Sequence, residues 1–348
     1  MNPYIFATLI FGLGLGTTIT LTSSHWLLAW MGLEMNTLAF IPLMAQHHHP
    51  RAVEAATKYF LTQAAGAAML MFASTTNASL TGQWDIYQVV HPLPATMITL
   101  ALALKVGLAP LHAWLPEVLQ GLDLATGLVL STWQKIAPFA LLLQLQPINP
   151  TLLTILGLLS TLVGGWGGLN QTQLRKILAY SSIAHLGWMI LALSFSPSLT
   201  FLTLLTYFIM TFSIFLTLKI NKATNMNTLA TSWAKAPALT ALTPLLLLSL
   251  GGLPPLTGFM PKWLILQELT KQSLGLTATF AALSALLSLY FYLRLSYAMT
   301  LTSAPNNLSG TTPWRLLPTQ FTLPLAVSTT TTICLLPLTP ALATLLTI

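Results

Sequence analysis

Charged residues are scarce in this chain. Of its 348 residues only 6 are acidic and 13 are Lys or Arg, so charged residues make up 5% of the sequence. A soluble domain uses about 25% charged residues to keep its surface hydrated. Hydrophobic residues contribute 55%, and the mean hydropathy is +0.76. The composition therefore excludes a soluble protein and predicts an all-α, polytopic membrane protein.

Cysteine is almost absent too, since Cys334 is the only one. A disulfide framework, a zinc cluster and an iron–sulfur site built by this chain alone are thereby excluded. The net charge of +7 comes with no basic run, so no nucleic-acid partner is expected. The glycines at 12–16 lie inside an apolar run and form no dinucleotide fingerprint. The apolar N-terminus M-N-P-Y-I-F resembles neither a signal nor a transit peptide. We expect this chain to bind no cofactor and no metal.

Long apolar runs are abundant instead. A membrane-crossing helix needs about 20 apolar residues, and windows of that kind predict about eleven transmembrane helices. The predicted spans are 3–22, 25–45, 54–76, 94–118, 123–146, 149–169, 173–195, 199–220, 237–270, 274–300 and 321–346.

The distribution of basic residues between the loops predicts the orientation. Most basic loop residues fall on the side of the N-terminus, which the positive-inside rule assigns to the cytoplasm or the mitochondrial matrix. An odd number of spans then puts the C-terminus on the opposite side. The basic residues on the N-terminal side are Arg51, Lys58, Arg175, Lys176, Lys222, Lys235 and Arg315.

Two predicted spans, 94–118 and 237–270, are interrupted by Gly and Pro. The segment G-L-A-P-L-H-A-W-L-P at 107–116 aligns without a gap with G-L-P-P-L-T-G-F-M-P at 252–261, and five of the ten residues are identical. The spans are the fourth and the ninth, and this odd offset inverts the second unit in the membrane. The pattern predicts an inverted repeat with discontinuous helices. The alternative is a chance likeness, since Pro and Gly kinks are common in membrane helices.

The repeat divides one membrane domain, residues 1–348, into two units and a tail. Residues 1–146 form the first five-helix unit and residues 147–300 the second. Residues 301–348 contribute a C-terminal helix that belongs to neither unit.

Four ionisable residues lie within predicted spans rather than at their ends: Glu34, Lys105, Lys135 and Lys262. Each charge at mid-membrane costs roughly 2.5–3.5 kcal/mol, so four together indicate a hydrated interior in which they pair. We expect Glu34 to pair with Lys105 across the second and fourth spans. A small movement of the carboxylate could then switch the lysine between holding and releasing a proton. The alternative is a static ion pair that fixes helix packing.

Other polar residues allow two interpretations. His112 and His185 are plausible relay members because imidazole titrates near neutral pH, but either could equally be a hydrogen-bonded packing residue. The histidines at 47–49 could suggest a metal site, although a solvated loop is favoured because no other ligand lies nearby. Ser181 and Ser182 favour helix packing over catalysis, since no base or acid accompanies them.

The motifs that carry these residues also carry a family resemblance over essentially the whole chain. The sequence resembles the subunit 2 family of mitochondrial NADH dehydrogenase, respiratory complex I, in its short vertebrate-like form. The matching segments are the M-N-P start, W-x-G-L-E-M-N, A-L-K-x-G-x-A-P-x-H-x-W-x-P-E, W-Q-K-I-A-P, L-R-K-I-L-A-Y-S-S-I-A-H-x-G-W and G-G-L-P-P-L-T-G-F-x-P-K-W.

The resemblance implies roles for the four ionisable residues. Antiporter-like subunits of this kind contain two inverted five-helix units, each with a discontinuous helix. Glu34 and Lys105 would form the switch, Lys135 the central relay and Lys262 the terminal proton site beside a neighbouring subunit. Full-length members have fourteen helices, so the expected eleven match the form that lacks three N-terminal ones.

The resemblance also implies a function: a core proton-translocating membrane subunit of NADH:ubiquinone oxidoreductase. NADH, FMN, iron–sulfur clusters and ubiquinone would bind to other subunits. Partners would be other membrane-arm subunits and lipid, with no homo-oligomer. The chain would lie in the mitochondrial inner membrane, with its N-terminus in the matrix and its C-terminus in the intermembrane space. The alternatives are a structural scaffold subunit and a free-standing cation/proton antiporter.

Overall fold

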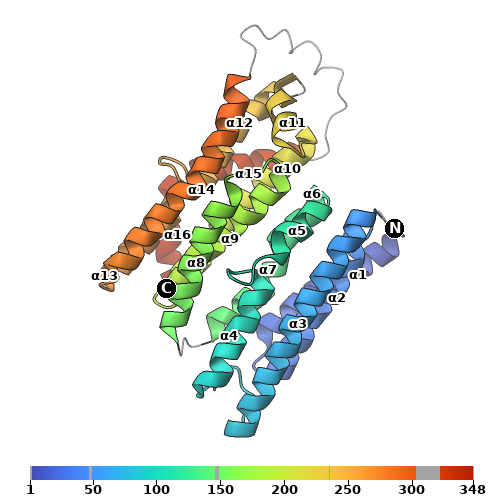
Figure 1. Ribbon diagram of the computed structural model, residues 1–348, viewed down its shortest axis with the longest axis vertical. Coiled ribbons are helices and arrows are strands. Elements are labelled where there is room, and N and C mark those ends of the chain that lie inside the picture. The colour runs from blue at the N-terminus through green and yellow to red at the C-terminus, as the bar shows by residue number, and fades with distance from the viewer. Residues whose placement is uncertain (1, 47–48, 146–148, 235, 303–321, 348) are drawn as a thin grey trace. The chain divides into compact units, whose positions relative to one another are not determined.

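The computed structural model describes residues 2–46, 49–145, 149–234, 236–302 and 322–347 (Figure 1). Regular structure within these residues is helical, apart from two isolated bridges. The chain divides into two compact units, Met1–Leu156 and Gly157–Ile348, with the boundary inside one helix. Four residues discussed above lie outside the described residues: His47, His48, Lys235 and Arg315.

The first unit combines long helices with two helices of 8 residues each, and several begin at clear sequence signals. Prolines at the first helical position start three of them, because a proline there loses no hydrogen bond. Figure 1 shows the first three helices side by side. The helices are α1 (Pro3–Thr22), α2 (Trp26–Met44), α3 (Pro50–Thr81), α4 (Pro92–Val106), α5 (Trp114–Gly121), α6 (Leu124–Ser131) and α7 (Trp133–Gln144), followed by α8 (Pro150–Gly168), which crosses into the second unit.

The second unit packs around a central helix, α9, which is buried along almost its whole length. A helix that is apolar all round is suited to such a position. The helices after α8 are α9 (Leu174–Leu193), α10 (Pro197–Asn221), α11 (Met226–Ala230), α12 (Pro237–Gly251), α13 (Phe259–Lys271), α14 (Gly275–Leu301), α15 (Thr322–Cys334) and α16 (Thr339–Thr347).

The predicted spans correspond to these helices. Among the described residues seven helices are long and apolar enough to cross a membrane, or eight with the bent pair near the C-terminus, when α6 and α7 are counted together as one helix, Leu124–Gln144. The remaining predicted spans fall on α3, whose sequence is rich in Ala, Ser and Thr, and on two helices that the structure breaks, α4/α5 and α12/α13. Both predicted discontinuities are therefore present.

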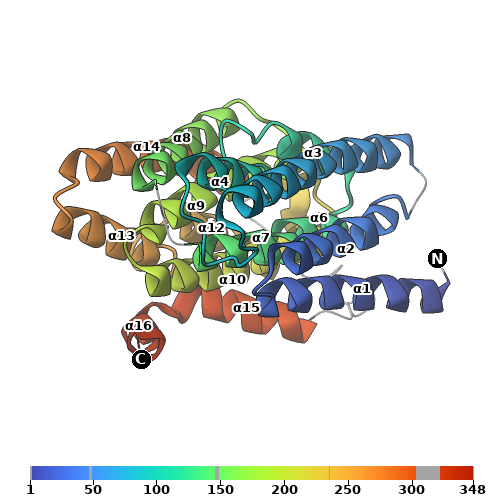
Figure 2. The ribbon, with the colours of Figure 1, turned by 90° about the horizontal axis from the view of Figure 1, so that it is seen from below.

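Two further breaks were not expected. The fifth predicted span, 123–146, is divided at Thr132 into α6 and α7. The last, 321–346, bends by 67° between α15 and α16 (Figure 2). Pro337 explains this bend because it has no N–H to donate to the preceding turn. The single C-terminal helix that was expected is therefore two helices joined by a bend.

In each unit a β-bridge joins the residue before one helix to the loop that follows the next helix. In the first unit His25 bridges Asp85, and in the second Gln173 bridges Asn225. Both bridges are antiparallel and are flanked by two backbone hydrogen bonds of 2.9–3.1 Å. The donors and acceptors are Trp26 N–H to Trp84 O, Ile86 N–H to Ser24 O, Leu174 N–H to Thr224 O and Met226 N–H to Thr172 O.

Candidate functional site

Glu34 and Lys105 meet in the interior of the first unit, as expected. Lys105 Nζ lies 3.9 Å from Glu34 Oε1, and the side chains are 2% and 22% exposed. Neither of these two atoms makes a hydrogen bond to the described residues. The distance is that of an ion pair with room for adjustment rather than of a short, fixed hydrogen bond.

The break in the fourth span places Lys105 in the last turn of α4. Gly107 ends the helix in the left-handed conformation, with φ of 89°, and its N–H donates to Ala103 O at 2.9 Å. The indole N–H of Trp114 donates to the freed Leu104 carbonyl at 3.1 Å. A cation is favoured at this helix end because the unpaired carbonyls are negative. The local sequence therefore both ends the helix and stabilises its lysine.

Lys135 is also buried, in the first turn of α7, and is 3% exposed. The unexpected break at Thr132 lies directly before it, and Lys135 N–H donates to Thr132 O at 3.2 Å. The adjacent Gln134 accepts a hydrogen bond from the Tyr59 hydroxyl at 3.4 Å. Tyr59 also interacts electrostatically with Glu34. Tyr59 therefore lies between the Glu34 pair and Gln134, the residue next to Lys135.

Sequence reasoning missed Tyr59 and Gln134. The only available signal was the polar pair Gln134–Lys135 inside an apolar span. Tyr59 carried none, because a single tyrosine at a span end is a common interfacial anchor. Only the packing of α3 shows that its hydroxyl points inward.

Several buried polar atoms of the first unit have no hydrogen-bond partner among the described residues. They include Glu34 Oε1, Lys105 Nζ, His112 Nδ1 and Gln134 Nε2. Buried polar groups are normally satisfied, and water fills polar cavities where protein groups do not. Three of these atoms belong to Glu34, Lys105 and Gln134, which Tyr59 links, and such atoms are expected to bind water.

Lys262 differs in its surroundings from Lys105. It lies in the first turn of α13, and its ammonium donates to the Gly251 carbonyl at 2.7 Å and to the Leu250 carbonyl at 3.5 Å. These are carbonyls at the end of α12, left free by the break at Gly252. The second break thus holds a lysine directly on backbone oxygens.

The two candidate histidines occupy different places. His112 is half-buried within the first break, where its Nδ1 has no hydrogen-bond partner among the described residues. His185 is buried on α9, with its ring centroid 5.6 Å from that of Tyr207. The hydroxyls of Ser181 and Ser182 donate to carbonyls of their own helix, both at 2.7 Å. These donations agree with the expectation of packing over catalysis.

His49 lies at the start of α3 and caps it. Its Nδ1 accepts a hydrogen bond from Arg51 N–H at 3.3 Å and so caps the start of α3. The part of the chain that the structure describes contains no group of three His, Cys, Asp or Glu side chains that could hold a metal.

Comparisons with known proteins were made at the level of sequence and of structure. A model of the family "NADH:quinone oxidoreductase/Mrp antiporter, TM" matches residues 23–288. A model of the "NADH dehydrogenase subunit 2 C-terminus" matches residues 289–343. NADH-ubiquinone oxidoreductase chain 2 of Tetraodon nigroviridis is 77% identical over 345 residues, which is 99% of both chains. The same chain of Gadus morhua is 70% identical over 346 residues, again 99% of both.

Solved structures agree with this assignment. A chain of respiratory complex I from Thermus thermophilus superposes with a TM-score of 0.87 at 30% identity, covering 99% of this chain and 80% of that one. The Mrp complex of Dietzia shares only the fold, with a TM-score of 0.78 at 19% identity over 86% of this chain and 61% of that one. This chain therefore belongs to the NADH:quinone oxidoreductase/Mrp antiporter family of membrane proteins, in its NADH-ubiquinone oxidoreductase chain 2 group.

Proposed function

We propose that this chain moves protons within the membrane arm of respiratory complex I. It is an antiporter-like, multi-pass subunit of the mitochondrial inner membrane, with the other membrane-arm subunits as partners. The buried Glu34–Lys105 pair at the end of a broken helix carries the proposal. NADH oxidation and quinone reduction take place in other subunits, so this chain contributes the proton chemistry.

The geometry of the pair suits a switch. At 3.9 Å the carboxylate stabilises the ammonium by about 4 kcal/mol if the effective dielectric constant is about 20. Doubling the separation would halve that energy. A change of about 2 kcal/mol alters a protonation equilibrium about 30-fold. A movement of Glu34 that doubles this separation would therefore be enough to change whether Lys105 keeps its proton.

The other relay residues take successive roles in this proposal. Lys135 receives protons within the first unit, with Tyr59, Gln134 and water as the connection. Lys262 is the terminal site of the second unit. Its ammonium rests on the Gly251 carbonyl, which binds a charged amine better than a neutral one. His112 and His185 serve as further proton carriers.

The same proposal includes the internal repeat, residues 1–146 and 147–300, with 301–348 as a tail. Three features support it: the gapless alignment of the two breaks, their matching left-handed glycines and the matching bridges His25–Asp85 and Gln173–Asn225. Because five helices separate equivalent elements, the second unit runs inverted through the membrane. The excess of basic loop residues on the side of the N-terminus supports an N-terminus in the matrix, and an odd number of spans then puts the C-terminus in the intermembrane space.

The test is a Glu34→Gln variant in the assembled complex. Glutamine keeps the size of the side chain but removes the charge that Lys105 faces. Protons pumped per electron, measured in reconstituted vesicles, should fall, while NADH oxidation continues. Glu117→Gln is the matched control, because Glu117 is half-exposed and pairs with Lys58 at 2.8 Å.

Blue-native electrophoresis completes the experiment by showing that both variants assemble. If Glu34→Gln pumped as many protons per electron as the control, the chain would be a scaffold subunit. If the wild-type chain migrated apart from NADH oxidation activity, it would be an autonomous antiporter.

A further inference from the structure

The core of the second unit contains a cluster of polar side chains, of which only His185 belongs to the proposed relay. Each member is buried, with at most 9% exposure. We call it the hydroxyl cluster. It consists of Ser181, Ser182 and His185 on α9, Tyr207 on α10 and Tyr292 on α14.

Tyr207 lies at the centre of the hydroxyl cluster. Its ring lies 5.6 Å from that of His185, and its hydroxyl interacts with those of Ser182 and Tyr292. The Ser182 O–H is occupied by the Ala179 carbonyl at 2.7 Å, so its oxygen is the acceptor for Tyr207. The serine therefore fixes the direction in which the Tyr207 hydroxyl points.

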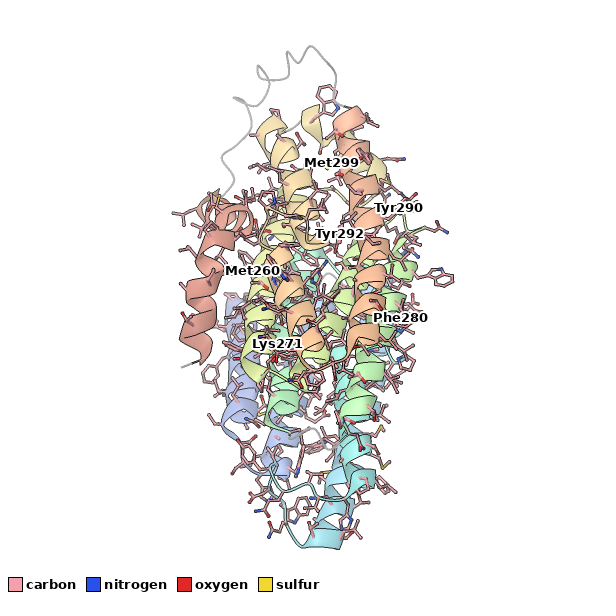
Figure 3. All side chains as sticks on the ribbon, turned by 90° about the vertical axis from the view of Figure 1, so that its left-hand side faces the viewer. Met260, Lys271, Phe280, Tyr290, Tyr292 and Met299 are labelled. Carbon is pink, nitrogen blue, oxygen red and sulfur yellow. The ribbon has the colours of Figure 1, made fainter. Side chains whose placement is uncertain are left out.

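Tyr292 is the unsatisfied member. Its hydroxyl is buried and makes no hydrogen bond of normal length to the described residues, although the Ser181 side chain interacts with it. Leaving a buried hydroxyl unpaired costs about 1–3 kcal/mol, so phenylalanine would be the more stable residue here. Figure 3 labels Tyr292 and the nearby Tyr290 on α14; Tyr290 is 59% exposed and Tyr292 only 1%.

The hydroxyl cluster ends next to Lys262. The ring of Tyr292 packs against Gly251, where an added Cβ would lie 3.6 Å from the ring. The carbonyl of that same glycine accepts the hydrogen bond from Lys262 at 2.7 Å. The cluster therefore extends within one unit from an imidazole to the surroundings of an amine.

The second unit offers no unpaired carboxylate that could carry protons. Residues 157–348 contain one acidic residue, Glu268, and it pairs with Lys271 at 3.5 Å. Glu34 lies nine positions after the bridge residue His25, and Ser182 lies nine positions after the bridge residue Gln173. A hydroxyl thus stands in the second unit where the first has its carboxylate.

We propose that the hydroxyls of Tyr207 and Tyr292 carry protons between His185 and Lys262, and that Ser181 and Ser182 are positioning residues. The proposal rests on the proton-moving function proposed above. Protonated His185 gives up its proton, each tyrosine oxygen accepts one proton as its own leaves, and the neutral amine of Lys262 takes the last. To pass its proton on, the Tyr207 O–H turns from Ser182 to Tyr292 or to a bridging water. Water bridges the remaining gaps. Both tyrosines end as neutral phenols, so charge moves only from imidazole to amine.

The decisive variant is Tyr292→Phe in the assembled complex, with Tyr290→Phe as the matched control on the same helix. The Lys262→Ala variant gives the reference value for complete loss of proton transfer in the second unit. We expect Tyr292→Phe and Tyr207→Phe to lower the protons pumped per electron as far as Lys262→Ala does. Assembly on native gels and uncoupled NADH oxidation should match the control.

The alternatives give different results. If Tyr292→Phe pumped like Tyr290→Phe while Lys262→Ala failed, the hydroxyl cluster would be structural and only this inference would be wrong. If Lys262→Ala pumped normally as well, the proposed function itself would be overturned. Should Tyr207→Phe not assemble, Tyr292→Phe still decides, because its hydroxyl makes no hydrogen bond of normal length to the described residues, so its removal should cost little stability.

Discussion

The two broken helices, α4/α5 and α12/α13, have nearly the same backbone and opposite chemistry. Gly107 and Gly252 end the first halves with φ of 89° and 80°, and the next N–H in each case donates to the carbonyl five residues back. Lys105 lies before its break and faces a carboxylate, whereas Lys262 lies after its break and binds carbonyls. The shared backbone makes a polar site at membrane depth, and the side chain placed there decides what the site does.

The aligned positions show how the difference arises. Where the second break has Lys262, the first has Glu117, which is half-exposed and bound to Lys58. Where the first has His112, with a free Nδ1 within the described part of the chain, the second has Thr257. Thr257 donates to the Thr332 carbonyl of α15 at 2.7 Å. The first break therefore lies beside an ion pair, whereas the second is held by backbone oxygens and by α15.

Replacing lysine by arginine should have the largest effect and tests whether both lysines exchange protons. Arginine keeps the charge but does not release a proton near neutral pH. We expect Lys135→Arg and Lys262→Arg to assemble, to oxidise NADH at a reduced coupled rate and to abolish proton transfer through this subunit. Proton-to-electron stoichiometry in vesicles is the measurement. Normal pumping by Lys262→Arg alone would show that the second break is only structural.

Removing the carboxylate of the first unit should have the next largest effect. Glu34→Ala leaves the Lys105 ammonium buried without its ion-pair partner, which costs about 3–5 kcal/mol. Glu117→Ala removes an exposed partner of Lys58 and should have little effect on stability. Thermal inactivation of the assembled complex compares the two. Equal midpoints would mean that water already replaces the carboxylate beside Lys105.

Substituting the two helix-ending glycines should separate strain from function. Both Gly107→Ala and Gly252→Ala force a left-handed conformation that costs about 1 kcal/mol. At Gly252 the new Cβ would lie 3.0 Å from Lys262 Nζ, whereas at Gly107 it would meet the Leu115 side chain at 2.9 Å. We expect only Gly252→Ala to reduce pumping beyond its loss of stability. Similar pumping by both variants would contradict a fixed Lys262 site.

The smallest expected effect concerns the attachment of the second break to α15. Thr257→Val removes the hydrogen bond to Thr332 and should cost about 0.5–1.5 kcal/mol. Hydrogen exchange of residues 253–258 should become faster, with pumping almost unchanged. Thr270→Val is the control, since its hydroxyl bonds only within its own helix. Exchange as slow as in the control would mean that α15 does not hold the break.

Much of the site was readable from sequence because charge at membrane depth is so costly. Glu34 is the only carboxylate in the predicted membrane interior, and Lys105 is one of three lysines there. The cost of an unpaired charge at that depth was enough to predict that the two form an ion pair. The Pro and Gly pairs likewise marked both discontinuous helices. Tyr59 and Gln134 could not be foreseen, because neutral polar residues carry a small penalty and are common in spans.

Helix breaks without a strong local signal could not be predicted from the sequence either. Thr132 has helical neighbours and no proline or glycine next to it, yet the helix is divided there. Such a break is decided by what packs around it. The bend at Leu335 does have a local signal, because Pro337 lies two residues further on. It was not predicted because the apolar run continues through it.

Composition and local pattern by themselves determined the class, the positions of the long apolar helices, the two broken helices and the charged residues that need an interior. They did so because the membrane penalises charge and unpaired backbone wherever these occur in the fold. The tertiary structure alone decided which hydroxyls face one another in the second unit and which carbonyls receive Lys262. Those contacts join residues up to 111 positions apart in the chain, such as Ser181 and Tyr292, and depend on how each helix is rotated about its axis. An apolar sequence with little amphipathic pattern does not encode that rotation locally; packing sets it.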